Sequence, residues 1–277
     1  DLDSIAIFTQ RHLHAEMVEK ALDAGKNVYS AVPIACTVED IGKIIDKVKS
    51  SHLVYMMGET CYYYPCAIFC RQRYEKGDFG HDITEMYGDF SRSGGDAWRR
   101  VAGIPPMFYP THSASMVLSA IHEHATKVSC FGLRDDFHTD NIYGDGKNEW
   151  DNPFSNETAL LRMSGGGVVR LNEFRRVGIN KPSSYITAFY GDLGSYECSV
   201  TQHTFQRGAA SGESTLENVG KLVNTCRYNN EMALGGLEAP ANGVRYIEGF
   251  SPIQDRSRLP KAMRTLAPGP HYNTHAF

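Results

Sequence analysis

Over residues 1–80, short apolar runs alternate regularly with segments whose apolar residues recur at helical spacing. This alternation restricts the possible folds of the chain more than any other part of the sequence. Apolar runs typical of strands occupy Ile5–Thr9, Asn27–Ser30 and His52–Gly58. Helical segments follow these runs in turn, at His12–Ala24, after a capping Thr37, and at Tyr64–Lys76. Because each strand is followed by a helix, consecutive strands are expected to pair in parallel through right-handed crossovers. The pattern therefore predicts an α/β first domain over residues 1–80.

From residue 81 onward the pattern changes to successive strands. Strand-like runs are expected at Ile83–Phe90, Lys127–Gly132, Thr158–Met163, Val168–Phe174, Ser184–Tyr190 and Ser195–Val200. One helix, His112–Glu123, interrupts them, and Ser164–Gly167 has the composition of a hairpin turn. Strands without intervening helices build antiparallel sheets, so residues 81–277 are predicted to form an α+β second domain. Residues 202–277 follow no regular pattern.

The composition is that of a soluble globular protein, with 42% hydrophobic and 22% charged residues. The sequence has no run of 18 apolar residues, so no membrane span is expected. The 28 basic and 32 acidic side chains give a formal net charge of −4. This balance gives no electrostatic reason to expect nucleic acid or an anionic membrane as a partner.

Seven cysteines, an odd number at irregular spacing, favour reduced thiols in a reducing compartment, and hence a cytoplasmic location. The closest cluster, Cys61, Cys66 and Cys70, lacks a second half that would complete a zinc site. His122 and His124 are too close in sequence to share one helix face, as a His-Glu-x-x-His metal site requires. No metal is therefore assigned.

Four stretches, in the expected order and spacing, resemble motifs of the Gfo/Idh/MocA family, which includes glucose–fructose oxidoreductase and inositol dehydrogenase. They are Thr9–Glu16 (Thr-Gln-Arg-His-Leu-His-Ala-Glu), Ala24–Tyr29 (Ala-Gly-Lys-Asn-Val-Tyr), Gly58-Glu59 with Tyr64-Pro65, and Tyr109–His112 (Tyr-Pro-Thr-His). The resemblance extends over nearly the whole chain. It implies a partial Rossmann-type parallel sheet over residues 1–80, followed by an α+β substrate and oligomerisation domain with a large open antiparallel sheet over residues 81–277.

The resemblance also implies that the chain is truncated at both ends, and that NAD or NADP binds only where the amino-terminal part of the family fold is present. That part carries a Gly-x-Gly-x-x-Gly turn for the cofactor pyrophosphate, and residues 1–277 contain no such sequence. The strand-to-helix turns that remain are expected to line the nicotinamide half of the site. Their cofactor-binding residues are Thr9, Gln10, Arg11, His14, Ser30, Ala31, Val32 and Pro33.

Two positions depart from the family pattern. The family's Glu-Lys-Pro triplet falls on Ala31-Val32-Pro33, and Val32 carries neither a proton nor a charge. The family's aspartate, one turn before its histidine, falls at or near Phe108 and Tyr109, whereas the histidine is retained as His112. The Tyr-Pro-Thr-His sequence is similar to that of a related branch, the NAD-dependent glycosidases, which use transient oxidation and elimination.

His112 is the expected catalytic base, because neutral imidazole can accept the proton of a carbinol hydroxyl, and Tyr109 is expected to relay or donate a proton. The expected substrate residues are Glu59, Tyr62, Asn172, Arg175 and Arg176. Alternative roles remain open: packing at the helix N-terminus for His112, a helix cap for Glu59, packing for Tyr62 and Tyr109, and solvated charges for the arginines. Strand alternation places Glu173 and Arg175 on one face and Asn172 and Arg176 on the other.

These expectations predict an NAD(P)-dependent oxidoreductase that acts on a sugar, polyol or glycoside. The alternatives are an NAD-dependent glycosidase and a non-catalytic relative that binds a sugar or a protein partner. The resemblance also implies a homodimer or higher homo-oligomer formed through the open antiparallel sheet.

Overall fold

The computed structural model describes residues 2–63, 65–80, 85–91, 102–176, 187–198, 203–207 and 215–220. These residues form two compact units that divide between Thr60 and Cys61, instead of at the expected boundary after residue 80. The earlier boundary arises because α3 (Pro65–Glu75) packs against α4 (Thr111–Ile121). Arg71 of α3, for example, donates a hydrogen bond of 2.8 Å to the carbonyl of Ser119 in α4.

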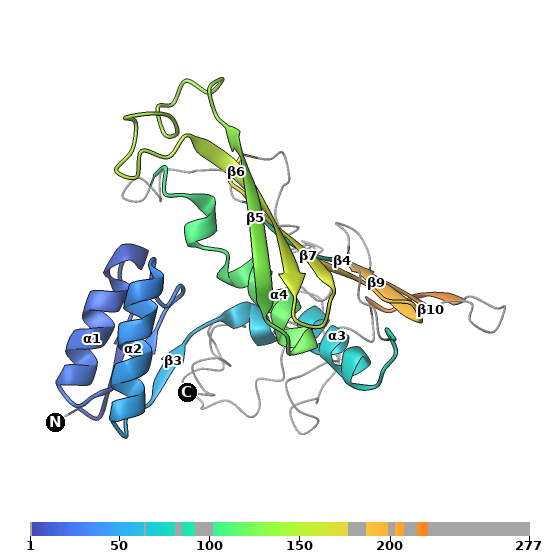
Figure 1. The fold of residues 1–277 in the computed structure, drawn as a ribbon, viewed down its shortest axis with the longest axis horizontal. Helices are drawn as coiled ribbons and strands as arrows, with labels where there is room; N and C mark the ends of the chain where they lie inside the picture. Colours follow the sequence, from blue (N-terminus) through green and yellow to red (C-terminus); the bar gives the residue numbers. More distant parts are fainter. Residues whose placement is uncertain are drawn as a thin grey trace, which may run out of the picture. The chain divides into compact units, whose positions relative to one another are not determined.

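The first unit is a three-stranded parallel sheet in the order β1-β2-β3. Its elements are β1 (Ser4–Ile7), η1 (Arg11–Leu13), α1 (His14–Asp23), β2 (Asn27–Ser30), α2 (Val38–Ser50) and β3 (Tyr55–Met57). The helices α1 and α2 lie side by side (Figure 1), as right-handed crossovers between consecutive strands require. Thr37 caps α2 as predicted, since its Oγ1 accepts a hydrogen bond of 3.2 Å from the amide of Asp40.

The second unit contains an eight-stranded sheet in the order β11-β10-β9-β8-β4-β7-β6-β5. Its strands are β4 (Glu85–Ser91), β5 (Ala125–Arg134), β6 (Phe154–Met163), β7 (Val168–Phe174), β8 (Thr187–Tyr190), β9 (Gly194–Cys198), β10 (His203–Arg207) and β11 (Thr215–Asn218). The long strands β5, β6 and β7 are adjacent (Figure 1). The sheet is antiparallel as predicted, except that β4 pairs with β7 in parallel. The predicted hairpin turn at Ser164–Gly167 is confirmed between β6 and β7.

The strands β10 and β11 correct the prediction of an irregular pattern from residue 202 onward. All four residues of β11 are exposed, so the sequence there shows no apolar alternation from which a strand could be inferred. Residues 221–277 lie outside the described part of the chain.

One face of the large sheet carries α4, which contacts β4 and β7 and packs against α3. The fully buried aromatic side chains of this core are Phe69, Phe79, Phe189 and Tyr196. Along β6, alternate residues from Ser155 to Met163 are buried on this face. The register between β6 and β7 places Glu157 opposite Glu173 there, beneath the first turn of α4.

The opposite face of β5, β6 and β7 carries exposed apolar side chains. Phe131, Leu133, Leu160 and Val168 are each at least 43% exposed. The register places Leu160 between Ser129 and Arg170, so Leu160 and Phe131 share this face. Among the described residues, no helix is long and apolar enough to cross a bilayer.

Candidate functional site

Tyr109 and His112 form a hydrogen-bonded pair where the chain enters α4. The short helix η4 (Pro106–Phe108) directly precedes Tyr109, and α4 begins two residues later at Thr111. The hydroxyl of Tyr109 and Nε2 of His112 share a hydrogen bond of 2.7 Å, and the two rings meet edge to face at 5.1 Å. Because phenol and imidazole can each donate or accept a proton, the pair is able to relay one.

Glu173 of β7 contacts this segment from the sheet face on which α4 packs. Its side chain has no solvent exposure, and its Oε1 accepts a hydrogen bond of 2.5 Å from Ser113, the residue after His112. Nη1 of Arg175 donates to the other carboxylate oxygen at 2.9 Å. Burial raises the pKa of Glu173 to about 7, although Arg175, Ser113 and the nearby His112 act in the opposite direction.

Glu157 of β6 holds the start of the same segment. Its Oε2 accepts a hydrogen bond of 2.7 Å from the amide of Met107, and Nη2 of Arg175 donates to the carbonyl of Pro106 at 3.2 Å. Burial raises the pKa of Glu157 as well. The two strands thus contact both ends of the segment from Pro106 to Ser113.

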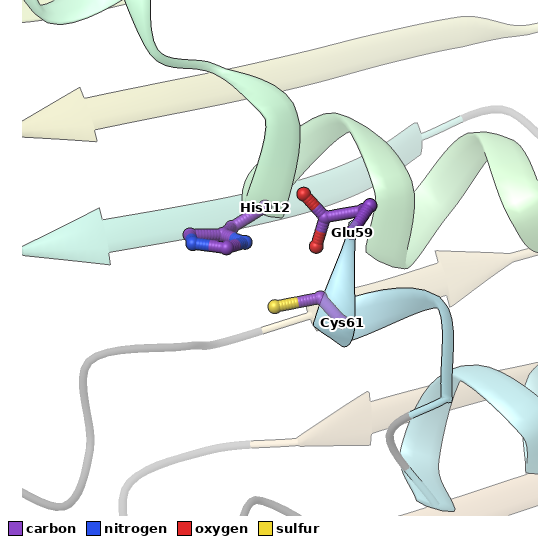
Figure 2. Close-up of side chains that lie close together, drawn as sticks. All are labelled: Glu59, Cys61 and His112. Atoms are coloured by element: carbon purple, nitrogen blue, oxygen red, sulfur yellow. The ribbon is translucent and has the colours of Figure 1, made fainter. Parts of the chain in front are cut away.

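Cys61 lies beside His112 in the second unit. Its Sγ and an imidazole nitrogen of His112 are within 4.8 Å of each other, and the cysteine is fully buried in η2 (Thr60–Tyr63). Figure 2 shows these two side chains; it also draws Glu59, which precedes Cys61 by two residues and belongs to the first unit. Glu59 is buried directly after β3, where its amide donates to the carbonyl of Met57 at 2.9 Å.

In the first unit, His14 connects the two turns that the resemblance assigns to the cofactor. Its Nδ1 lies 2.7 Å from the carbonyl oxygen of Pro33 and its Nε2 lies 3.2 Å from that of Thr9. Ser30 is fully buried, and its hydroxyl shares a hydrogen bond of 2.8 Å with Tyr55 of β3. Burial raises the pKa of Tyr55 to about 12. His14 and Ser30 therefore have partners within the protein fold.

The other predicted cofactor residues occupy the same two turns. The carbonyl of Gln10 accepts the amide of Leu13, and Arg11 is largely buried in η1. The amide of Ala31 donates to Ile7 of β1, and the Val32–Pro33 peptide is cis. Both turns follow parallel strands at one sheet edge, where open α/β sheets bind nucleotides. The resemblance assigns this edge to the nicotinamide half of a dinucleotide, while the Gly-x-Gly-x-x-Gly sequence of the pyrophosphate turn has no counterpart in the 277 residues.

The predicted substrate residues have different surroundings from one another. One face of the Tyr62 ring is covered by the Arg71 guanidinium, whose carbon lies 4.0 Å from the ring centroid, which supports the packing alternative. Asn172 is buried and its Oδ1 accepts a hydrogen bond of 2.9 Å from Thr158.

Arg175 and Arg176 contact different groups, as the alternation of side chains along the strand predicts. Arg175 joins Glu173 next to the Tyr109–His112 segment. Arg176 instead pairs with Asp135, at 3.4 Å, and with Asp140. Neither arginine is a freely solvated charge.

Sequence reasoning missed Glu173 and Glu157 as members of this site. The signal for Glu173 was present in the alternation of β7, in which Val169 and Leu171 point to the core and Glu173 continues the same face. A carboxylate at an apolar position of a strand indicates a specific buried partner.

One known protein family matches the amino-terminal part of the chain. Residues 1–59 match the family described as "Oxidoreductase family, NAD-binding Rossmann fold" (GFO_IDH_MocA). Residues 1–59 are therefore of the Gfo/Idh/MocA type. This confirms the resemblance found in its motifs, and a parallel sheet followed by a large antiparallel sheet is the fold expected for the type.

Two curated proteins and one solved structure illustrate what this chain is similar to. It is 29% identical over 138 residues to "Glycosyl hydrolase family 109 protein 2" of Bacteroides fragilis, covering 45% of this chain and 32% of that protein. It is 24% identical over 124 residues to "scyllo-inositol 2-dehydrogenase (NAD(+))" of Bacillus subtilis, covering 44% and 33%. The chain thus spans about a third of the length of these curated relatives.

The third relative is the solved structure of an inositol dehydrogenase homolog from Azotobacter vinelandii, complexed with NADH and myo-inositol. It matches with a TM-score of 0.60 at 16% identity, over 79% of this chain and 56% of that chain. At this identity the likeness establishes the fold alone.

Proposed function

We propose that the protein is an NAD(P)-dependent oxidoreductase that acts on a sugar, a polyol or a glycoside. The observation that carries the proposal is the 2.7 Å hydrogen bond between Tyr109 and His112, on a segment held by buried charged residues. The type of the chain and the names of its relatives, which include an NAD(+)-dependent inositol dehydrogenase, support the same activity.

Each unit contributes a different part of the chemistry. In the first unit, the turns at Thr9–His14 and Ser30–Pro33 are the proposed holders of the nicotinamide half of NAD(P). The bound nicotinamide supplies a hydride acceptor. In the second unit, His112 is the proposed final acceptor of the carbinol proton. The Tyr109 hydroxyl takes the proton from the carbinol as it gives its own proton to Nε2 of His112.

A second candidate function is redox-assisted cleavage of a glycoside. It is favoured by the tyrosine that stands beside His112 where the family pattern has an aspartate, and by the glycosyl hydrolase name of the Bacteroides fragilis relative. In this reaction Tyr109 would act on the carbon acid or on the leaving group, in addition to relaying the carbinol proton.

The test is an activity screen of the full-length protein with NAD and NADP, on inositols, aldoses and nitrophenyl glycosides. His112→Ala is expected to lower turnover by about 10²- to 10⁴-fold on the true substrate, because it removes the proton acceptor. His124→Ala is the matched control, since His124 is exposed just beyond the same helix. Wild-type activity that His112→Ala leaves unchanged would contradict the assignment of His112, and a folded wild type with no activity on any substrate would favour the non-catalytic alternative.

The exposed apolar face of β5, β6 and β7 supports a further part of the proposal, a homodimer or higher oligomer formed through this sheet. An apolar surface of this kind loses contact with water when a second copy covers it.

A further inference from the structure

A compact group of buried charges lies under the Tyr109–His112 segment and contacts it at three points. Glu157 accepts from the amide of Met107, Arg175 donates to the carbonyl of Pro106, and Glu173 accepts from the hydroxyl of Ser113. The first two contacts hold η4, before Tyr109, while the third holds the first turn of α4, directly after His112.

The charges of these three residues do not cancel. Two carboxyl groups, Glu157 and Glu173, interact with one guanidinium, that of Arg175. All three residues are at most 8% exposed, so solvent screens their charges weakly. An excess negative charge in such surroundings is costly unless a positive charge or a proton balances it.

His112 is placed to provide that balance. The charge interaction between Glu173 and His112 favours the carboxylate when the imidazole is protonated. The hydrogen bond from Ser113 holds the Glu173 carboxylate against the residue next to His112, so the negative charge lies beneath the position at which the proposed proton transfer places a positive charge. The other titratable side chains that the described structure places against His112 in the second unit are Tyr109 and Cys61.

We propose that Glu173 is the positioning residue of the Tyr109–His112 pair. It fixes the first turn of α4 through Ser113, and its negative charge balances His112 after proton transfer. No bond to substrate is assigned to it, because its carboxylate is fully buried beneath the helix. The proposal rests on the proposed function, in which His112 accepts a proton.

The test replaces Glu173 by Gln, which keeps the size and a hydrogen-bonding group but removes the charge. Turnover is expected to fall about tenfold with little change in KM, and the acid limb of the pH–rate profile to move about one unit towards lower pH. The direction follows because His112 loses its proton more readily without the neighbouring carboxylate. The same shift is expected in an NMR titration of isotope-labelled histidine, in which the His112 signal is identified by its loss in His112→Ala.

Glu157→Gln is the matched control. It also removes a buried carboxylate from the neighbouring strand position, but its contact is with the Met107 amide. The His112 midpoint is expected to move less in this variant than in Glu173→Gln. Glu173→Asp, which retains the charge, should recover the wild-type midpoint even if it lowers turnover.

An unchanged His112 midpoint in folded Glu173→Gln would overturn the proposal and leave Glu173 a purely structural role. If that variant does not fold, Ser113→Ala provides the same test, since loss of the hydroxyl disfavours the carboxylate and should move the midpoint in the same direction by a smaller amount. A shifted NMR midpoint in a protein without measurable turnover would support the coupling while contradicting the proposed function, so the two failures are distinguishable.

Discussion

Glu157 and Glu173 are cross-strand partners on β6 and β7, and both carboxyl groups are buried on the sheet face that carries α4. Adjacent carboxylates repel each other, and Arg175 interacts with both. Burial raises the pKa of Glu173 to about 7. Glu173 therefore gains or loses its proton in the neutral pH range. Stability and chemistry of the second unit are therefore linked through this pair.

The first prediction concerns the pH dependence of stability. Because the pKa of Glu173 is higher in the folded protein than its usual value of 4.5, the folded state holds a proton that the unfolded state releases between pH 4.5 and 7. The stability contributed by this group is fully present below pH 4.5 and is lost as the pH rises through 7. The loss is on the order of 3 kcal/mol.

Thermal unfolding of wild type and Glu173→Gln between pH 4.5 and 8 measures this contribution. The difference in melting temperature between the two proteins should move in favour of the variant as the pH rises. A difference that is constant across this range would contradict the raised pKa.

The second prediction separates the two candidate reactions. Tyr109→Phe removes the hydroxyl that His112 contacts while keeping the ring and its edge-to-face packing. We expect a loss of less than about tenfold in polyol oxidation, because a water molecule can take the place of the hydroxyl in the relay. The expected loss in glycoside cleavage is about 10²-fold or more, because there the tyrosine would act on a reacting atom. Steady-state rates on both substrate classes provide the measurement, and equal losses on both would remove the argument for a distinct role in cleavage.

The third prediction concerns Val32, which the resemblance aligns with the family's lysine position. If the protein is a polyol dehydrogenase, Val32→Lys should raise the rate of polyol oxidation, because the positive charge of the lysine would stabilise the alkoxide that forms as the hydroxyl loses its proton. Val32→Met is the control for side-chain length. A lower glycoside-cleaving rate in Val32→Lys, with no gain on polyols, would instead favour elimination chemistry.

The fourth prediction concerns His14, which bridges the carbonyls of Thr9 and Pro33. His14→Ala removes the imidazole N–H donor from between the two carbonyls and should lower the stability of the first unit by about 1–3 kcal/mol. Hydrogen exchange of amides in β1 and β2 is the appropriate measurement. His12→Ala, at an exposed position two residues earlier, should have little effect, and equal effects of the two substitutions would contradict the bridging role.

The fifth prediction addresses assembly through the open sheet face. Phe131→Glu introduces a charge at a position that is 75% exposed in the single chain, and it should dissociate the proposed oligomer. Sedimentation velocity at micromolar concentration measures the association state. Val128→Glu, at an exposed position on the opposite face of the same strand, is the control for charge. A monomeric wild type would contradict the proposal.

Local sequence determined the elements of this protein wherever a few neighbouring residues carry the information. The helical period and the Thr37 cap predicted α2, the glycines of Ser164–Gly167 predicted the β6–β7 turn, and the Tyr-Pro-Thr-His sequence predicted a histidine in the first turn of α4. Periodicity and capping act over one or two turns, so they can be read without knowledge of distant contacts.

Only the tertiary structure decided which distant residues meet. The division at Thr60 and Cys61 follows from the packing of α3 on α4, and the parallel pairing of β4 with β7 joins segments about 80 residues apart in sequence. The apposition of Glu157 and Glu173 depends on strand register, since a slip of one residue would turn either carboxylate to the opposite face. The histidine was therefore predictable from its motif, whereas the buried charges that support it became visible only once the strands were paired.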